Sequence, residues 1–149
     1  MIDLESIQKM WAVDCQIKEN ELDTSSIDSA KLHAKYLELF NMARLTLKKR
    51  ELELSELKQE KWRYFAGKMT KEEMDEKSWD YDPFKGATKP MKSELGNYID
   101  SDSDIQRVKL KIEYSKIVAE TLEEILNNLK WRHSTIKNII EWKKFTAGL

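Results

Sequence analysis

Residues 103–149 read SDIQRVKLKIEYSKIVAETLEEILNNLKWRHSTIKNIIEWKKFTAGL and carry the strongest structural signal in this chain. Ser103 and Gln106 have the spacing of a capping box, which predicts a helix start, and Gly148 predicts the helix end. Between them a seam recurs at alternating steps of three and four residues, and all its positions except Ser115 and His133 are apolar. The seam consists of Ile105, Val108, Ile112, Ser115, Ala119, Leu122, Leu126, Leu129, His133, Ile136 and Ile140. A seam sustained over about five heptads predicts a coiled coil.

The two flanks of this predicted helix differ in character. Val118, Ile125 and Ile139 widen the apolar seam on one flank, which favours a bundle of more than two helices. The opposite flank carries a row at seven-residue spacing, made up of Lys109, Lys116, Glu123, Lys130, Lys137 and Lys144. This row is either a set of solvated lysines beside a coiled-coil seam or part of a track for a polyanion. His133, a polar residue within the seam, is expected to set the helix register or the oligomeric state.

Signals in the rest of the chain complete an all-α prediction. Residues 1–17 form a short helix capped by Asp3, and residues 18–30 form a polar, acidic connection. Asp28 or Ser29 then caps a long basic helix, residues 29–65, which no glycine or proline interrupts. The second long helix spans residues 103–147. We therefore predict a single elongated helical domain over residues 1–149, with its oligomerisation helix in residues 103–149.

The middle segment, residues 66–102, is acidic and rich in helix breakers. Thr70 and Glu73 form a candidate capping box for one or two helical turns. Trp79, Tyr81 and Phe84 indicate that part of the segment docks onto a neighbouring surface, because a solvated linker seldom carries aromatic residues. The breakers are Gly67, Pro83, Gly86, Pro90 and Gly96.

Charge alternates strongly along the chain although the whole chain has a formal net charge of only -1. Counts of basic and acidic side chains give net charges of -5 for residues 1–30, +6 for 31–71, -6 for 72–104 and +4 for 105–149. Such segregation produces basic surfaces that suit a polyanion and acidic surfaces that suit a basic partner. Residues 72–104 are the candidate surface for a protein partner.

The sequence contains no signature of catalysis, metal binding or cofactor binding. Its four glycines are isolated, so no phosphate-binding loop is expected, and neither His33 nor His133 has partners at metal-ligand spacing. The acidic run Asp100–Asp104 is explained by helix capping rather than by calcium binding. Cys15 is the only cysteine, which fits a reducing compartment. Because no catalytic motif is present, the chain is expected to be a non-enzyme. Because it has no signal peptide and no long apolar run, it is expected to be a cytoplasmic protein without a membrane span.

Residues 58–68 read KQEKWRYFAGK and combine cations with aromatic rings. An unpaired nucleic-acid strand requires both, because cations neutralise phosphates and rings stack on bases. The candidate DNA-contact residues are Lys58, Lys61, Trp62, Arg63, Tyr64, Phe65 and Lys68, with Lys48, Lys49 and Arg50 from the middle of the same helix. The alternative explanation is a set of core aromatics with solvated charges between them.

The order of these features resembles the UvsY family, the recombination mediators of T-even-like phages, and especially its cyanophage-type members. The resemblance covers nearly the whole chain and is tightest at residues 61–67, 97–102 and 136–148. Family members carry a Lys-x-Arg pair before Tyr-Tyr-x-Gly, and Tyr64-Phe65-Ala66-Gly67 is similar to that ending. Lys61 falls where the family has arginine, whereas Gln59 replaces the lysine. The cations that contact DNA therefore have to be sought among Lys58, Lys61 and Arg63.

The resemblance implies a helical protein that binds single-stranded DNA and loads the phage recombinase onto a strand covered by the phage single-strand-binding protein. It also implies a ring-like homo-oligomer formed through the last helix. The candidate oligomerisation residues are Ile112, Ala119, Leu122, Leu126, Leu129, His133, Ile136 and Ile140. Composition and periodicity alone favour the alternative, a coiled-coil structural or adaptor protein that binds acidic protein partners and not DNA, and the resemblance turns the choice toward the mediator.

Overall fold

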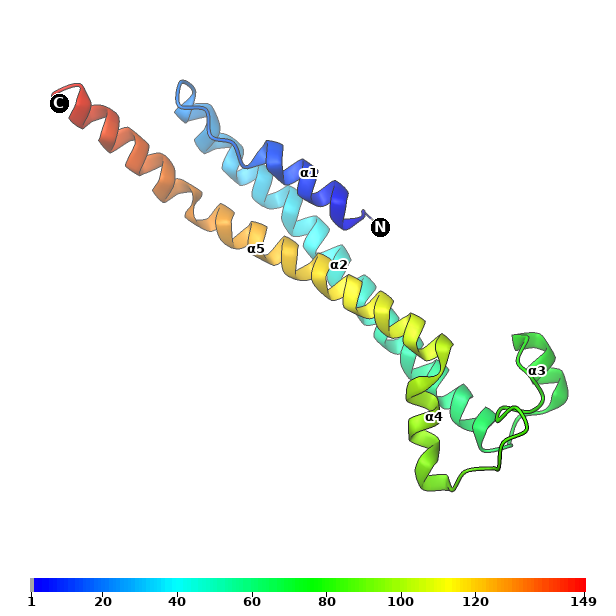
Figure 1. The fold of residues 1–149 in the computed structure, drawn as a ribbon. Helices are drawn as coiled ribbons and strands as arrows, with labels where there is room; N and C mark the ends of the chain where they lie inside the picture. The colour runs from blue at the N-terminus through cyan, green and yellow to red at the C-terminus, as the bar shows by residue number, and fades with distance from the viewer. Residues whose placement is uncertain (1) are drawn as a thin grey trace. The chain divides into compact units, whose positions relative to one another are not determined.

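The computed structural model describes residues 2–149 and is built from helices and their connections (Figure 1). The α-helices are α1 (Leu4–Asp14), α2 (Leu22–Phe65), α3 (Lys71–Lys77), α4 (Leu95–Ser101) and α5 (Ser103–Thr146), and a short 3₁₀ helix η1 (Lys92–Glu94) precedes α4. No β-strand occurs within residues 2–149. The predicted all-α fold with two long helices is confirmed.

Helix α2 begins at Leu22 rather than at residue 29. The expected cap residue Ser29 instead lies inside the helix, where its hydroxyl donates a hydrogen bond to the Ser25 carbonyl oxygen at 3.0 Å. Ser25 is itself buried, although serine favours caps and turns over helix interiors. Tertiary packing therefore extends α2 through a polar segment whose local composition predicts a connection.

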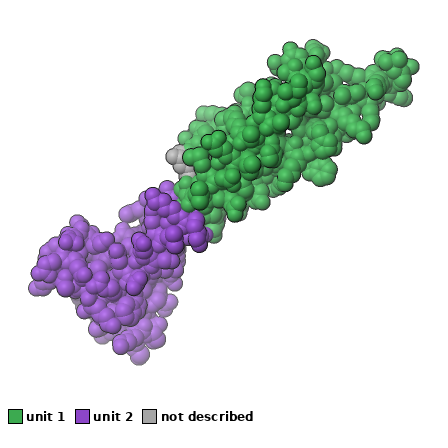
Figure 2. All heavy atoms as spheres, turned by 180° about the vertical axis from the view of Figure 1, so that it is seen from behind, with its two compact units in different colours: residues 1–47, 114–149 green, residues 48–113 purple. Residues whose placement is uncertain are grey.

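The chain divides into two compact units (Figure 2). Unit 1 comprises residues 1–47 and 114–149, and unit 2 comprises residues 48–113. Both boundaries fall inside the long helices, so α2 and α5 each contribute to both units. The prediction of a single elongated domain stays a prediction.

Unit 1 is a helical bundle in which α1 packs with the first part of α2 and the larger part of α5. Trp11 of α1 meets Tyr36 of α2 edge to face, with ring centroids 5.4 Å apart. The buried core consists of Ile7, Tyr36, Ala43, Val118, Ala119, Leu122, Ile125, Leu126 and Leu129. Much of the seam predicted on α5 is thus buried within its own chain.

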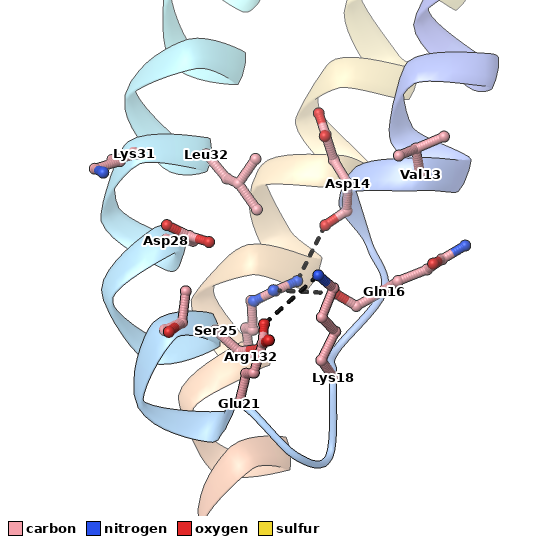
Figure 3. Close-up of a pocket in the computed structure, with 11 residues that line it drawn as sticks. Val13, Asp14, Gln16, Lys18, Glu21, Ser25, Asp28, Lys31, Leu32 and Arg132 are labelled. Atoms are coloured by element: carbon pink, nitrogen blue, oxygen red, sulfur yellow. Dashed lines mark hydrogen bonds and ion pairs between the residues drawn. The ribbon is translucent and has the colours of Figure 1, made fainter.

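The end of α1 is attached to unit 1 by polar contacts (Figure 3). The Asp14 carboxylate accepts hydrogen bonds from the Lys35 ammonium at 2.6 Å and the Tyr36 hydroxyl at 2.8 Å. Burial raises the pKa of Asp14, but these two hydrogen bonds together with the charges of Lys35 and Arg132 hold the pKa below its usual value. The buried Arg132 guanidinium of α5 donates to the backbone carbonyls of Asp14, Cys15 and Gln16 at 3.2–3.4 Å. Asp14 is the last residue of α1 and the other two follow it, so these carbonyls have no partner within the helix.

Unit 2 contains α3, η1, α4 and the adjoining parts of α2 and α5. Its buried core consists of Tyr64, Phe65, Met69, Met74, Leu95, Ile99 and Ile105. Trp79 and Phe84 of the middle segment pack against this core, as the sequence predicts, whereas Tyr81 is exposed. The capping box of Thr70 and Glu73 is also confirmed at the start of α3.

The start of α5 differs from the prediction in one detail. Asp102, not Ser103, caps the helix, because its carboxylate accepts the backbone N–H groups of Asp104 and Ile105 at 3.0 and 3.2 Å. The expectation that the run Asp100–Asp104 serves helix capping agrees with this geometry.

Candidate nucleic-acid interface

All the candidate DNA-contact residues belong to unit 2, along the last part of α2 and the turn that follows it. Helix α2 ends in a Schellman motif, in which Gly67 N–H donates to the Tyr64 carbonyl at 3.2 Å and Lys68 N–H to the Arg63 carbonyl at 2.9 Å. Gly67 has a φ of 72°, a conformation that glycine adopts without strain. The resulting turn brings the Lys68 ammonium to 4.7 Å from the centre of the Trp62 ring.

Lys61 is enclosed rather than presented to solvent. Its side chain is 3% exposed, and its ammonium lies 3.1 Å from an Asp102 oxygen and 2.9 Å from an Asp104 oxygen. The same ammonium is 3.8 Å from the centre of the Trp79 ring. The hydrogen bond from Lys61 is the main cause that lowers the pKa of Asp104. A buried cation with two carboxylate partners stabilises the fold around it, because removing it would leave the carboxylates uncompensated.

Tyr64 and Phe65 are also buried, which agrees with the alternative explanation that the aromatic residues of this stretch belong to the core. The Tyr64 hydroxyl donates to the Asp80 carbonyl at 2.6 Å, and its pKa is raised chiefly by burial. Phe65 packs against Phe84 with ring centroids 5.9 Å apart. Stacking of these two rings on bases would require the core of unit 2 to open, so their role as direct contacts stays a prediction. Trp62, which is 42% exposed, needs no such opening.

The remaining candidate cations are more accessible. Lys49, Lys58 and Lys68 are exposed and form no ion pair within residues 2–149. Lys48 is exposed, and its ammonium nitrogen lies 3.9 Å from a carboxylate oxygen of Glu51. The half-buried Arg50 completes this group along α2.

Two further cationic side chains, Arg63 and Lys89, belong to residues close to the turn at Gly67. Arg63 is half-buried and forms two hydrogen bonds with the Glu73 carboxylate, both of 3.1 Å. Sequence reasoning missed Lys89, whose ammonium nitrogen would lie 4.0 Å from a methyl group added to Gly67. No local pattern could indicate this proximity, because the two residues lie far apart within the middle segment.

The candidate oligomerisation residues divide into two groups. Ile112, Ala119, Leu122, Leu126, Leu129 and Ile136 are buried within this chain, whereas His133 and Ile140 are exposed. Their role in assembly stays a prediction. Sequence reasoning missed a second apolar stripe on α5, opposite the seam by helical geometry and interrupted by Glu124 and Asn138. The exposed members of this stripe in unit 1 are Ile117, Trp131, Trp142 and Phe145. Trp142 and Phe145 stack with ring centroids 5.8 Å apart.

Unit 1 also contains a pocket near the end of α1. A surface pocket of about 320 Å³ near Arg132 in unit 1 is lined by acidic and basic side chains, and Arg132 is already engaged with backbone carbonyls (Figure 3). Within residues 2–149, no group of three or more His, Cys, Asp or Glu side chains could hold a metal ion. In the same part of the chain, no helix has the length and apolar character needed to cross a membrane.

The fold and this surface together define a class of protein, namely an all-helical protein whose distinctive chemistry is a cation–aromatic helix end. The family model described as "Recombination, repair and ssDNA binding protein UvsY" matches residues 10–149. The chain belongs to the UvsY family.

Solved structures agree with this assignment at the level of the fold. One crystal form of the bacteriophage T4 recombination mediator protein UvsY has a TM-score of 0.80 and 20% sequence identity, over 99% of each chain. A second crystal form has a TM-score of 0.78 and 18% identity, over 97% of this chain and 99% of the T4 chain. No curated protein sequence matches this chain.

Proposed function

We propose that this protein is a recombination mediator that binds single-stranded DNA through unit 2. In this proposal it promotes loading of a phage recombinase onto a strand covered by single-strand-binding protein, in the cytoplasm of the infected host cell. Membership of a family described as recombination, repair and single-stranded-DNA-binding supports the role. The observation that carries the site is the exposed Trp62 ring with the Lys68 ammonium 4.7 Å from its centre.

The interface that we propose is smaller than the set of candidate residues in the sequence. Trp62 supplies a stacking face, and Lys58 and Lys68 supply phosphate contacts beside it. Lys48, Lys49 and Arg50 extend the basic surface along α2. Lys61, Tyr64 and Phe65 act indirectly in this proposal, by holding the end of α2 against the middle segment.

Such a protein needs no bond chemistry, and we propose that it is not an enzyme. Its task is to hold a strand in a conformation that the recombinase accepts and to weaken the competing protein's contacts. Phosphate neutralisation releases counterions, so its binding to DNA should be strongly salt-dependent and independent of sequence.

We further propose that the active form is a homo-oligomer joined through the stripe on α5 that contains Ile117, Trp131, Trp142 and Phe145. A second copy of this chain is the occupant that we propose for this stripe, because the seam itself is largely occupied within the chain. Several identical weak sites in one assembly would bind a long strand tightly through multivalency.

The test is fluorescence anisotropy of a labelled, mixed-sequence single-stranded oligonucleotide at low and moderate salt, with the matching duplex for comparison. We expect salt-sensitive binding that favours the single strand, and weaker binding by Lys58→Ala combined with Lys68→Ala. Lys9→Ala, at a cation of unit 1 that is largely exposed, is the matched control. If the protein is oligomeric but binds neither the single strand nor the duplex, the result would contradict the proposal and favour an adaptor that binds acidic proteins.

A further inference from the structure

Arg63 and Glu73 form a half-exposed ion pair in unit 2. Arg63 Nη2 lies 3.1 Å from each oxygen of the Glu73 carboxylate. The two side chains are 40% and 38% exposed, so both remain in contact with solvent. A half-exposed pair of this kind contributes little net stability.

The Glu73 carboxylate is held in place by its own helix as well as by Arg63. One of its oxygens accepts the Thr70 N–H at 3.0 Å, and the Glu73 N–H donates to the Thr70 hydroxyl oxygen at 3.3 Å. The Thr70 hydrogen bond is the main cause that lowers the pKa of Glu73, with Arg63 as a further cause. The capping box of α3 thus keeps a negative charge facing Arg63.

A carboxylate in this position resembles a phosphate of a DNA strand. Both groups offer two oxygens to a guanidinium, and both form charge-assisted hydrogen bonds with it, as the two Glu73 oxygens do here with Arg63 Nη2. Arg63 directly follows Trp62 in the sequence, and its carbonyl accepts the N–H of Lys68. Arg63 therefore belongs to the same helix end as Trp62 and Lys68, the proposed strand-binding residues.

We propose that the Glu73 carboxylate occupies the phosphate position on Arg63 and that a DNA strand binds there by displacing it. Glu73 is then a residue that sets DNA affinity, although it does not contact DNA in the complex. This inference rests on the proposed function. Lys61 is the contrasting case, because an ammonium that is 3% exposed between two carboxylates cannot be reached without opening the core.

The experiment compares Glu73→Gln with Glu72→Gln on the full chain. Glutamine at position 73 can still accept the Thr70 N–H, so the capping box is retained while the charge facing Arg63 is lost. Glu72 lies beside Glu73 in the first turn of α3, is exposed, and forms no ion pair within residues 2–149. Both variants lose one negative charge at the same end of the same helix, so only the contact with Arg63 differs.

We expect Glu73→Gln to tighten binding of a short single-stranded oligonucleotide by about two- to fivefold at moderate salt. Glu72→Gln should have a smaller effect because its charge acts only through screened, longer-range interaction. In an Arg63→Gln background, Glu73→Gln should give no gain over the background. Circular dichroism should show unchanged helix content in every variant.

Equal effects of Glu72→Gln and Glu73→Gln, in a wild-type protein that binds the strand, would overturn this inference and leave the proposed function intact. A gain from Glu73→Gln that persists in the Arg63→Gln background would also overturn it. Absence of binding by the wild type and by every variant would contradict both the inference and the proposed function. Binding that appears only in Glu73→Gln would support the inference in its strongest form.

Discussion

Unit 1 and unit 2 are stabilised by different means. Unit 1 depends on apolar residues at heptad spacing, such as Leu122 and Leu126, packed against α1 and α2. Unit 2 depends on a core of aromatic and other apolar side chains closed by an ion cluster, in which the buried Lys61 contacts the half-buried Asp102 and Asp104. A regular apolar seam can be recognised from the sequence, whereas ion pairs between residues far apart in the sequence cannot. The candidate site lies in unit 2, beside the ion cluster of Lys61 that the sequence does not reveal.

The largest expected effect is the unfolding of unit 1 caused by Leu126→Asp. Leu126 is buried in the core, so an aspartate there would remove apolar contacts and bury a charge, at a cost of more than about 4 kcal/mol. Thermal unfolding followed by circular dichroism measures the change, with Asn127→Asp on the exposed face as the control. A stability close to the wild type would show that the seam is not the core of unit 1.

The second prediction concerns unit 2. Lys61→Ala leaves Asp102 and Asp104 facing one another without their cation, and we expect a destabilisation of about 3 kcal/mol. Hydrogen exchange should accelerate in residues 48–113 and much less in unit 1. Lys58→Ala, one turn earlier on the exposed face, serves as the control. Unchanged exchange in Lys61→Ala would contradict a structural role for Lys61.

The third prediction separates assembly from folding. Trp142→Ser combined with Phe145→Ser removes exposed apolar surface, so the helices of unit 1 should remain folded while the oligomer dissociates. Affinity for a long single strand should fall at least about tenfold because multivalency is lost. Sedimentation velocity and anisotropy measure the two effects. An assembly of unchanged size would place the contact between subunits elsewhere.

The fourth prediction concerns stacking at the exposed ring. Trp62→Ala should weaken single-strand binding by about tenfold, since stacking on an aromatic ring contributes about 1–3 kcal/mol per base. Thermal stability should change little because the ring is exposed. Anisotropy and a thermal melt measure these two effects. If melting shifts strongly and binding does not, Trp62 belongs to the packing of unit 2.

The smallest effect is the pH dependence of unit 2. Lys61 lowers the pKa of Asp104 below its usual value of 3.8, so the ion pair contributes stability above the pKa of the unfolded state. That contribution is lost as the pH falls through the lower pKa of the folded state. Acid titration of hydrogen exchange in residues 48–113 should therefore show reduced protection below about pH 4, and Asp104→Asn should weaken this dependence.

The outcome of the sequence predictions depends on whether a feature is local in the sequence, in either unit. The extent of α5, the capping box of Thr70 and Glu73, and the docking of Trp79 and Phe84 are confirmed. These features depend on local hydrogen bonds or on the position of apolar residues, both of which are visible in the sequence. The early start of α2 and the cap formed by Asp102 were not predicted, because burial and competing hydrogen bonds decide them.

The sequence by itself determined that this protein is all-helical, that its last helix has an apolar seam, and that its cations and aromatic rings gather near the end of α2. Helical periodicity and turn chemistry are local properties, so they can be recognised without a structure. Only the tertiary structure decided that Lys61, Tyr64 and Phe65 are buried, that Trp62 is exposed, and that Glu73 faces Arg63. Adjacent residues of a helix point in different directions, and the segments that pack against them determine which side chains solvent can reach.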